Sequence, residues 1–234
     1  MNNIVIFCDF DGTITINDTV DHLLSIFADK NWINIEESWK KGEIGSKECL
    51  KKQLECIDYI SEKQLNEFIE DIEIDVYFIN FLEFLKIQEN LNHKKIELYV
   101  VSDGFDFFIN RTLEKYGIKR FVKVFSNKLI YSKGKLIPVF PLFNQYCKKD
   151  SGLCKCEIIK KLKKDRRVLY IGDGTSDICA ANLADILFAK DSLAEHCDQN
   201  GINYIKFKTF KDICEYLYLN LGEEQYVKNE MLVG

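Results

Sequence analysis

The sequence predicts an α/β protein with a doubly wound, mainly parallel, Rossmann-like sheet and a small inserted helical cap. Three observations indicate this class. Short apolar runs rich in β-branched residues alternate with amphipathic segments. Several of these runs end in polar turns that contain glycine. A long stretch after the first run, from about residue 18 to 90, has helical patterns and no strand pattern. Parallel strands need helical crossovers, so the alternation favours a parallel sheet.

The strand candidates are continuous apolar runs, which indicates burial on both faces of the sheet. They cover residues 4–8, 96–101, 121–125, 168–171, 186–189 and 204–207. Residues 128–140 predict a hairpin, because two alternating segments flank the turn Ser132-Lys133-Gly134-Lys135.

The helices are predicted from apolar residues at helical spacing and from their end signals. Ser61 and Gln64 form a capping box ahead of an amphipathic segment. Gly117 is placed to end a helix over residues 105–116, and another helix is predicted over 155–164. The helical block interrupts the sheet pattern, so we expect two units. Residues 1–14 and 86–234 would form the α/β core, and residues 15–85 the cap.

Composition excludes several classes of protein. With 234 residues, 47% of them hydrophobic and 13% aromatic, the chain can fill a core and is not of the disordered type. A net charge of −5 argues against a nucleic-acid partner, and no apolar run is long enough to predict a membrane partner. Nine cysteines are an odd number for a disulfide framework, so we expect reduced thiols and a cytoplasmic location.

Polar turns follow three of the predicted strands, at residues 9–13, 102–104 and 172–177. The carboxyl ends of parallel strands meet at one edge of the sheet, where ligands bind. Asp9 and Asp11 are two positions apart, so both side chains can point the same way from extended backbone. We therefore expect the three turns to build one site.

Four carboxylates would meet there, since Asp173 and Asp177 join Asp9 and Asp11. Such a group repels itself unless a cation lies among its members. Carboxylate, carbonyl and water oxygens are the ligands that Mg²⁺ takes, so the sequence predicts Mg²⁺ as the cofactor.

An anion site is predicted beside these acids. Lys155 opens a helix just before the strand that leads to Asp173, and Ser102 offers a hydroxyl group. The backbone N–H groups of Asp103 and Gly104 lie in a tight turn at a helix start, which suits a phosphate. A cation, a lysine, a hydroxyl and backbone donors together indicate phosphoryl transfer.

At these residues the chain resembles a known superfamily. Residues 9–13, Val101-Ser102, Lys155 and residues 172–177 resemble, in order, the four motifs of the haloacid dehalogenase (HAD) superfamily of phosphatases. The helical insert after the first motif resembles the cap of its phosphoserine-phosphatase-like branch. The resemblance implies a HAD-like core and a phosphatase acting on a small phosphorylated metabolite.

The resemblance also implies a role for each motif residue. Asp9 would be the nucleophile that becomes an aspartyl phosphate, and Asp11 the general acid and base. Asp9, the carbonyl group of Asp11, and Asp173 would hold Mg²⁺.

The other motif residues would act on the phosphate or on its ligands. Ser102 and Lys155 would bind phosphate, together with the turn at Asp103 and Gly104. Asp177 would orient Lys155 or a metal-bound water.

Two groups within the superfamily share features with the chain. Residues 9–18 and 104–108 resemble the methionine-salvage enol-phosphate phosphatases. Ser102-Asp103 and residues 169–174 resemble the phosphoethanolamine and phosphocholine phosphatases, where an acid beside the motif serine meets a cationic head group. The leaving group therefore stays open between these two kinds.

Four residues are expected to set substrate specificity. Asn17, Asp18 and His22 would face the cap entrance, and Asp103 would contact the leaving group. The alternative for His22 is an ordinary histidine of the helix surface, and for Asp103 a solvated turn residue.

Two further readings stay open. The same fold also serves phosphomutases or phosphotransferases, and a catalytically silent module that binds phosphorylated metabolites would keep the motifs. Separately, Cys147, Cys154 and Cys156 could hold a structural metal or be ordinary loop thiols. The oligomeric state is not readable from these patterns.

Overall fold

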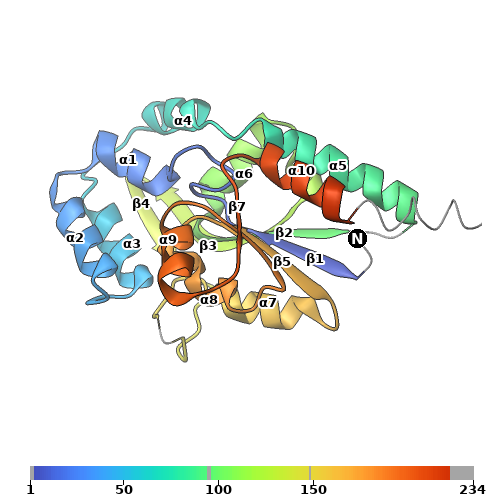
Figure 1. Cartoon of the computed structure of the whole chain (residues 1–234). Coiled ribbons are helices and arrows are strands. Elements are labelled where there is room, and N and C mark those ends of the chain that lie inside the picture. Colours follow the sequence, from blue (N-terminus) through green and yellow to red (C-terminus); the bar gives the residue numbers. More distant parts are fainter. Residues whose placement is uncertain (1–2, 94–95, 148, 222–234) are drawn as a thin grey trace, which may run out of the picture.

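A mostly parallel sheet forms the centre of the computed structural model, which describes residues 3–93, 96–147 and 149–221 (Figure 1). Within these residues the sheet has seven strands in the order β4-β3-β2-β1-β5-β6-β7. They are β1 (Ile4–Cys8), β2 (Glu97–Phe105), β3 (Lys123–Ser132), β4 (Lys135–Val139), β5 (Arg167–Gly172), β6 (Ile186–Ala189) and β7 (Ile205–Lys206). Every neighbouring pair is parallel except the β3–β4 hairpin. The predicted fold class is confirmed.

Helices surround the sheet and extend beyond one of its ends. They are α1 (Thr19–Phe27), α2 (Asn31–Lys40), α3 (Ser46–Glu55), α4 (Glu62–Asp71), α5 (Tyr77–Asn92), α6 (Asp106–Lys115), α7 (Lys155–Lys163), α8 (Ile178–Ala181), α9 (Asp191–Asn200) and α10 (Phe210–Leu221). The predicted signals hold: Ser61 and Gln64 form a capping box, and Gly117, with φ of +70°, follows the end of α6. We call α1–α4 the cap helices.

One predicted strand differs from the structure. Residues 121–125 were expected to be extended, but Lys119–Phe121 form a 3₁₀ turn and β3 begins at Lys123. β3 then continues into the hairpin, so a single strand pairs with β2 on one side and with β4 on the other. The sequence pattern divides it in two, because only its second part, from Asn127 on, alternates between buried and more exposed side chains.

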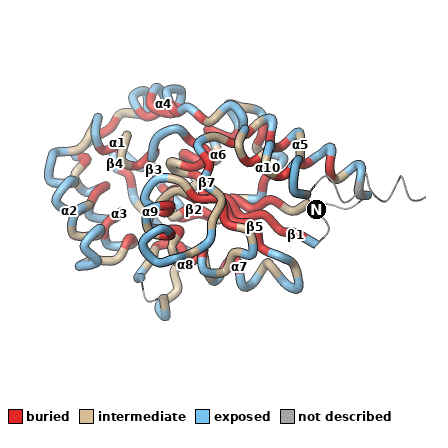
Figure 2. Tube along the Cα trace, in the orientation of Figure 1, coloured by how far each residue is buried: buried red, intermediate tan, exposed pale blue. Residues whose placement is uncertain are grey.

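The sheet is covered on both faces, as the alternation along β1 shows. Ile4, Ile6 and Cys8 belong to a core with side chains of α5, α6 and α10. Val5 and Phe7 belong to a second core with side chains of α7, α8 and α9. Successive side chains of a strand point to opposite faces, so a continuous apolar run implies helices on both sides. The buried strands form the red centre of Figure 2.

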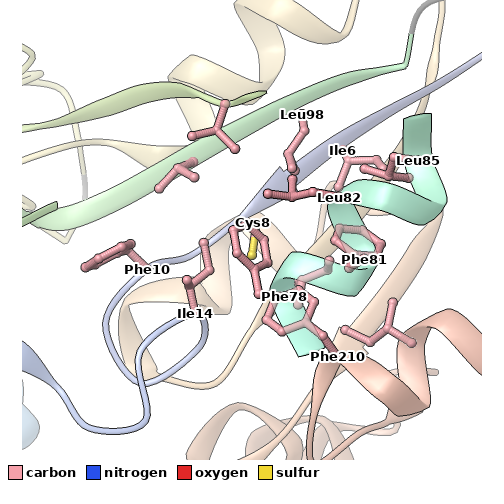
Figure 3. Packing of buried hydrophobic residues seen from close by; sticks show 14 of the residues in the cluster. Ile6, Cys8, Phe10, Ile14, Phe78, Phe81, Leu82, Leu85, Leu98 and Phe210 are labelled. Atoms are coloured by element: carbon pink, nitrogen blue, oxygen red, sulfur yellow. The ribbon is translucent and has the colours of Figure 1, made fainter. Parts of the chain in front are cut away.

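Helix α5 packs on the sheet rather than on the cap helices. Phe78 and Phe81 of α5 meet Phe210 of α10 at ring-centroid distances of 4.8 and 5.3 Å, and they lie beside Ile6 and Cys8 of β1 (Figure 3). This packing favours a cap that ends before α5. We therefore propose that the chain passes from the cap back to the α/β core near residue 75, and not near residue 85 as expected. We call this point the second junction.

The cap helices share a separate apolar core with parts of the α/β unit. Side chains of α1, α3 and α4 pack there against Phe105, Phe108, Leu129 and Leu136 of β2, α6 and the β3–β4 hairpin. The helices α1–α4 thereby lie beyond the carboxyl ends of the strands. Among the described helices, none combines the length and apolar character that a membrane crossing requires.

β1 lies at the centre of the strand order, with β2 on one side and β5 on the other. The chain order reverses there, and in such sheets ligands bind just outside the carboxyl ends of these strands. The turns after β1 and β5 and the carboxyl end of β2 are therefore the place to look for the site. The turn expected at residues 102–104 is instead the last part of β2, where the register with β3 shifts between Val101 and Phe105.

Candidate active site

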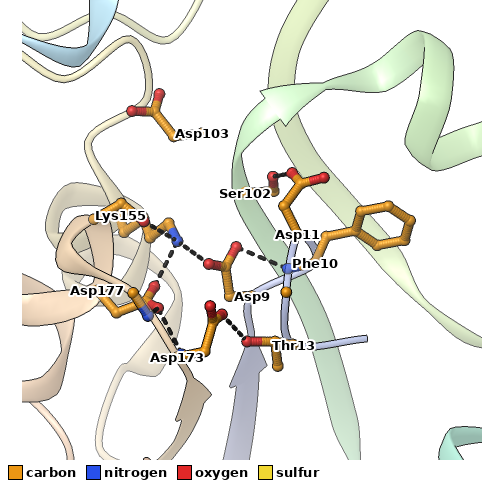
Figure 4. Close-up of polar contacts among 12 residues, drawn as sticks. Asp9, Phe10, Asp11, Thr13, Ser102, Asp103, Lys155, Asp173 and Asp177 are labelled. Atoms are coloured by element: carbon orange, nitrogen blue, oxygen red, sulfur yellow. Dashed lines mark hydrogen bonds and ion pairs between the residues drawn. The ribbon is translucent and has the colours of Figure 1, made fainter. Parts of the chain in front are cut away.

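Asp9 follows β1 directly and is 4% exposed. Its backbone N–H donates to the Ile171 carbonyl at 2.9 Å, which keeps the residue in line with β5. One carboxylate oxygen accepts from the Phe10 backbone N–H at 2.7 Å, and the other lies 2.8 Å from Lys155 Nζ (Figure 4). Burial raises the pKa of Asp9, and so does the charge of Asp177, whereas Lys155 lowers it.

Lys155, the first residue of α7, is 2% exposed. Its Nζ donates to Asp177 Oδ1 at 2.5 Å and to Ser176 Oγ at 3.1 Å, besides its contact with Asp9. Burial opposes the charged form, but the carboxylates of Asp177 and Asp9 outweigh it and raise the pKa of Lys155. A buried cation is thus held at the carboxyl end of β1.

Both carboxylate oxygens of Asp177 accept two hydrogen bonds each. Oδ1 accepts from Tyr170 Oη at 2.6 Å in addition to Lys155, and Oδ2 accepts from the backbone N–H groups of Asp173 and Gly174, both at 3.0 Å. Burial alone would raise its pKa, but Lys155 and these hydrogen bonds hold the pKa of Asp177 below its usual value. The residue is therefore built to fix Lys155 and the turn after β5.

Asp173, in the same turn, accepts fewer hydrogen bonds than Asp177. Its Oδ1 accepts from Thr13 Oγ1 at 2.5 Å. Burial, together with the charge of Asp177, raises the pKa of Asp173 to about 7. Gly12 lies opposite with φ of +71°, and a Cβ there would come within 2.5 Å of Asp173 Oδ2. Only glycine allows the first turn to approach this carboxylate so closely.

Carboxylate oxygens of Asp9, Asp173 and Asp177 lie within 4.8 Å of one another. An all-oxygen donor set of this kind fits Mg²⁺. Because N–H and O–H donors surround Asp177, Asp9 and Asp173 suit a cation better, and these two were predicted from the sequence. The carboxylate of Asp11 faces away from the group, which agrees with its predicted use of a carbonyl oxygen only.

Asp11 is held by the carboxyl end of β2 and by the start of α1. Oδ2 accepts from Ser102 Oγ at 3.0 Å, and Oδ1 accepts from the hydroxyl and, at 3.3 Å, the backbone N–H of Thr19. Burial raises the pKa of Asp11 although these hydrogen bonds oppose the shift. Ser102 Oγ accepts in turn from the Gly104 N–H at 2.8 Å. A raised pKa in a fixed carboxyl group suits a proton donor.

Asp103 points away from Asp9 and Asp11, although it neighbours Ser102 in sequence (Figure 4). One of its oxygens accepts from Asn127 Nδ2 at 2.9 Å and from the Leu153 N–H at 2.7 Å, and the other accepts from Ser46 Oγ. Both carboxylate oxygens of Asp103 thus accept hydrogen bonds from the protein itself, and not from the position expected for a phosphate or a leaving group.

A cavity of about 120 Å³ opens between the strand ends and the cap helices. From the α/β unit it is lined by Asp9, Asp11, Ser102, Asp103, Gly104 and residues 173–176. From the cap it is lined by Asp18, Val20, Asp21, Glu36, Trp39, Ser46, Cys49, Leu50 and Gln53. No Lys, Arg or His is among these lining residues. Apart from Lys155 beneath its floor, the charged walls of the cavity are acidic.

The three cap residues expected to set substrate specificity do not line the same cavity in the structure. Asp18 lines the cavity and caps α1 by accepting from the N–H groups of Val20 and Asp21. Asn17 and His22 line a different hollow, and the His22 ring packs on Phe68 at 5.3 Å. We leave Asn17 and His22 out of the proposed site.

Sequence reasoning missed several partners that complete the site. They are Thr13, Thr19, Ser46, Tyr170 and Ser176. Thr13, Tyr170 and Ser176 lie inside the quoted segments and could have been named from them. Thr19 and Ser46 carry no local signal, because their roles arise from contacts with other segments.

The cysteines take no part in the acidic group. All nine are free thiols. Cys147 and Cys154 contact each other, and Cys156 contacts Cys179 on α8. Among the described residues, the group of side chains close enough to share a metal ion consists of aspartates.

The fold and the strand-end aspartates define a class of protein, and solved structures share it. An analogue of the phospho-aspartyl intermediate of phosphoserine phosphatase superposes with a TM-score of 0.68 at 21% identity, over 91% of this chain and 97% of that one. A substrate-bound phosphoserine phosphatase gives 0.65 at 22% identity, over 92% and 99%. The chain therefore has the fold of the HAD superfamily.

The family follows from the sequence comparisons. The family described as "Putative Phosphatase" matches residues 4–194, and the chain belongs to it. A 2-hydroxy-3-keto-5-methylthiopentenyl-1-phosphate phosphatase of Bacillus cereus (strain B4264) is 33% identical over 94% of this chain and 98% of its own length. One of Bacillus velezensis is 29% identical over 94% and 92%. The chain is thus a phosphoric monoester hydrolase of the HAD type.

Proposed function

We propose that the chain is a Mg²⁺-dependent phosphomonoesterase that hydrolyses a small phosphorylated metabolite through an aspartyl phosphate on Asp9. The observation that carries this proposal is one buried constellation: Asp9 against Lys155, Asp173 beside it, and Asp11 held by Ser102 on the same cavity. The names of the Bacillus relatives support a small phosphate ester as substrate.

In the first half-reaction, an Asp9 carboxylate oxygen attacks phosphorus while the bond to the leaving oxygen breaks. Asp11 gives its proton to that oxygen, and burial, which raises the pKa of Asp11, favours the protonated form that this step needs. Lys155 balances the negative charge that gathers on the phosphoryl oxygens. Once phosphate is bound, the Ser102 hydroxyl and the backbone N–H of Gly104 would donate hydrogen bonds to it.

In the second half-reaction, water attacks the phosphorus of the aspartyl phosphate. Asp11, now deprotonated, takes a proton from this water, and the bond from phosphorus to Asp9 breaks to release inorganic phosphate. Asp177 acts through Lys155, which it holds at 2.5 Å. Asp9, Asp173 and the Asp11 carbonyl group would hold Mg²⁺. When bound, the ion supplies positive charge that neutralises the phosphate and lowers the repulsion among the acids.

The test is phosphate release from a panel of phosphomonoesters, with Mg²⁺ and with a chelator. Asp9→Asn should lower the rate by on the order of 10⁴-fold or more. Asp58→Asn is the matched control, because Asp58 is an exposed acid of the cap region. Full activity of Asp9→Asn, or activity that survives removal of all divalent metal, would refute the mechanism.

The same assay separates the two alternatives. A phosphomutase or phosphotransferase would consume ester faster than it frees inorganic phosphate, and a silent module would bind phosphate esters without turnover. A cytoplasmic location remains a prediction from the odd number of cysteines, to be checked by cell fractionation.

A further inference from the structure

The carboxylate of Asp103 joins segments that are distant in sequence. Oδ1 accepts from the Leu153 N–H at 2.7 Å and from Asn127 Nδ2 at 2.9 Å, and Oδ2 accepts from Ser46 Oγ. Asn127, which is fully buried, also donates to the Asp103 backbone carbonyl at 2.6 Å. One side chain thus connects the carboxyl end of β2 to β3, to the loop before α7 and to a cap helix.

Ser46 is the contribution of the cap to this set. It is the first residue of α3 and is 7% exposed. Its hydroxyl donates to Asp103 and accepts from the Gly152 N–H at 3.2 Å. A Cβ on the preceding Gly45 would lie 2.5 Å from the Asp150 carbonyl oxygen, so the start of α3 rests directly on the loop backbone.

The loop that receives Ser46 leads into the catalytic lysine. Leu153 is 1% exposed and lies two residues before Lys155. Gly152 has no room for a side chain, since a Cβ would be 2.8 Å from Asn127 Nδ2. The hydrogen bonds that hold the cap helix therefore also fix the backbone from which Lys155 reaches Asp9.

We propose that Asp103 is a positioning residue that couples closure of the cap helices to the seating of Lys155, with Ser46 as its partner on the cap. This inference rests on the proposed phosphatase function. With α3 withdrawn, one Asp103 oxygen and the Gly152 N–H would both lose their partner, which disfavours the open arrangement. Both Asp103 oxygens are engaged by the protein, so the residue acts through its neighbours and not on the leaving group.

A double-mutant cycle on kcat/KM tests the coupling. Ser46→Ala and Asp103→Asn should each lower kcat/KM by about tenfold, the usual effect of losing a hydrogen bond to a charged group. The double variant should be no slower than the slower single variant, because both changes break one connection. Losses that multiply to about 100-fold would refute the coupling. Ser25→Ala is the control, since Ser25 is exposed and bonds only within α1.

Two substrates separate positioning from substrate contact. The assay compares phosphoethanolamine with propyl phosphate, whose leaving group is uncharged. If Asp103 only positions Lys155, Asp103→Asn lowers kcat/KM by the same factor for both esters. A loss at least tenfold larger for phosphoethanolamine would show a direct contact with the ammonium group and overturn the proposal.

Hydrogen exchange gives a readout that does not depend on turnover. Ser46→Ala should speed amide exchange about tenfold at Gly152, and also at Leu153, whose acceptor is Asp103 and not Ser46. Unchanged exchange at Leu153 would refute the coupling. If the wild-type protein released no phosphate from any ester, the proposed function would fail while this measurement still decided the inference.

Discussion

At the residue scale, the site depends on short approaches that only glycine allows. The carboxyl end of β2 brings Gly104 against Asp11: a Cβ at Gly104 would lie 2.2 Å from Asp11 Oδ2 and 3.0 Å from Ser102 Oγ. The motif serine and the acid of the first motif meet because no side chain stands between them. Gly104 therefore matters to the site because its missing side chain leaves room for the contact between Asp11 and Ser102.

Gly104→Ala should lower kcat by on the order of 100-fold, because the new methyl group would displace the Asp11 carboxyl group, the proposed proton donor. Steady-state kinetics and a melting curve measure the effect. Gly42→Ala is the counterpart: Gly42 has open space around it but φ of +75°, so alanine should cost about 1 kcal/mol of stability and leave kcat unchanged. Equal kcat losses in both variants would contradict this.

At the element scale, α1 and α2 bring acids together on the cap wall. Asp21 of α1 and Glu36 of α2 both line the cavity, and Glu36 accepts from Gln53 Nε2 at 2.8 Å and pairs with Lys40 at 3.2 Å. Burial, and then the charge of Glu36, raises the pKa of Asp21 to about 6. The charged form of Asp21 therefore costs folding free energy.

Asp21→Asn should stabilise the protein, and the gain should depend on pH. Because the pKa of Asp21 is higher in the folded chain than in the unfolded chain, the charge is a cost above about pH 6 and none below about pH 4. We expect a gain on the order of 1–2 kcal/mol at pH 8 that vanishes as the pH falls from 6 to 4. Urea unfolding across this range measures it. A gain that does not vary with pH would show that the Asp21 charge is not the cause.

Helices α5 and α10 show how one element anchors another. Phe210, the first residue of α10, is fully buried between Phe78 and Phe81, and its backbone N–H donates to Asp75 Oδ2 at 2.6 Å. Asp75 lies at the proposed second junction between the cap and the α/β core. The contact therefore supports placing the end of the cap near this residue.

Phe210→Ala should lower the free energy of unfolding by about 3–5 kcal/mol, the usual effect of removing a buried aromatic ring. Leu219→Ala in the same helix, at a residue 60% exposed, should change it by less than about 0.5 kcal/mol. Denaturant unfolding of both variants measures the difference. Similar effects of the two substitutions would mean that α10 is not anchored by this ring.

At the scale of the whole molecule, the cap and the core enclose a cavity with charged walls of one sign. Its lining holds seven acidic residues and, among these residues, no basic one: Asp9, Asp11, Asp18, Asp21, Glu36, Asp103 and Asp173. Near the floor, Lys155 and a bound cation would offset the phosphate charge. In the wall that would face the leaving group, Lys40 pairs with Glu36 from outside the lining, but the charged lining residues themselves are all acids, so the wall disfavours a carboxylate there.

The cavity should therefore discriminate between two esters that differ by one carboxylate. We expect kcat/KM for phosphoethanolamine to exceed that for phosphoserine by at least tenfold, although phosphoserine phosphatases share the fold. Phosphate release from both esters at equal Mg²⁺ measures the ratio. The Asp21→Asn/Glu36→Gln double variant should lower the ratio of the two kcat/KM values. Faster hydrolysis of phosphoserine would contradict the electrostatic argument.

Much of the fold and the outline of the site could be read from the chain. Asp9 and Asp173 were placed together because buried apolar runs define parallel strands, and parallel strands end at one edge. Lys155, at a helix start, was singled out through the resemblance to the superfamily. Helix ends were also readable, as at Ser61 and Gly117, since capping depends on residues within a few positions.

The sequence by itself thus determined the sheet, its inserted helices and which chemical groups stand at the strand ends. Only the tertiary structure decided that α5 packs with the core, and that Asp103 turns to Ser46 and Leu153 rather than towards the phosphate site. The physical reason is range. Strand and helix patterns arise from neighbours in the chain, whereas Asp103 meets partners 57 and 50 positions away. No local pattern encodes such a contact, because its geometry exists only when the segments have packed.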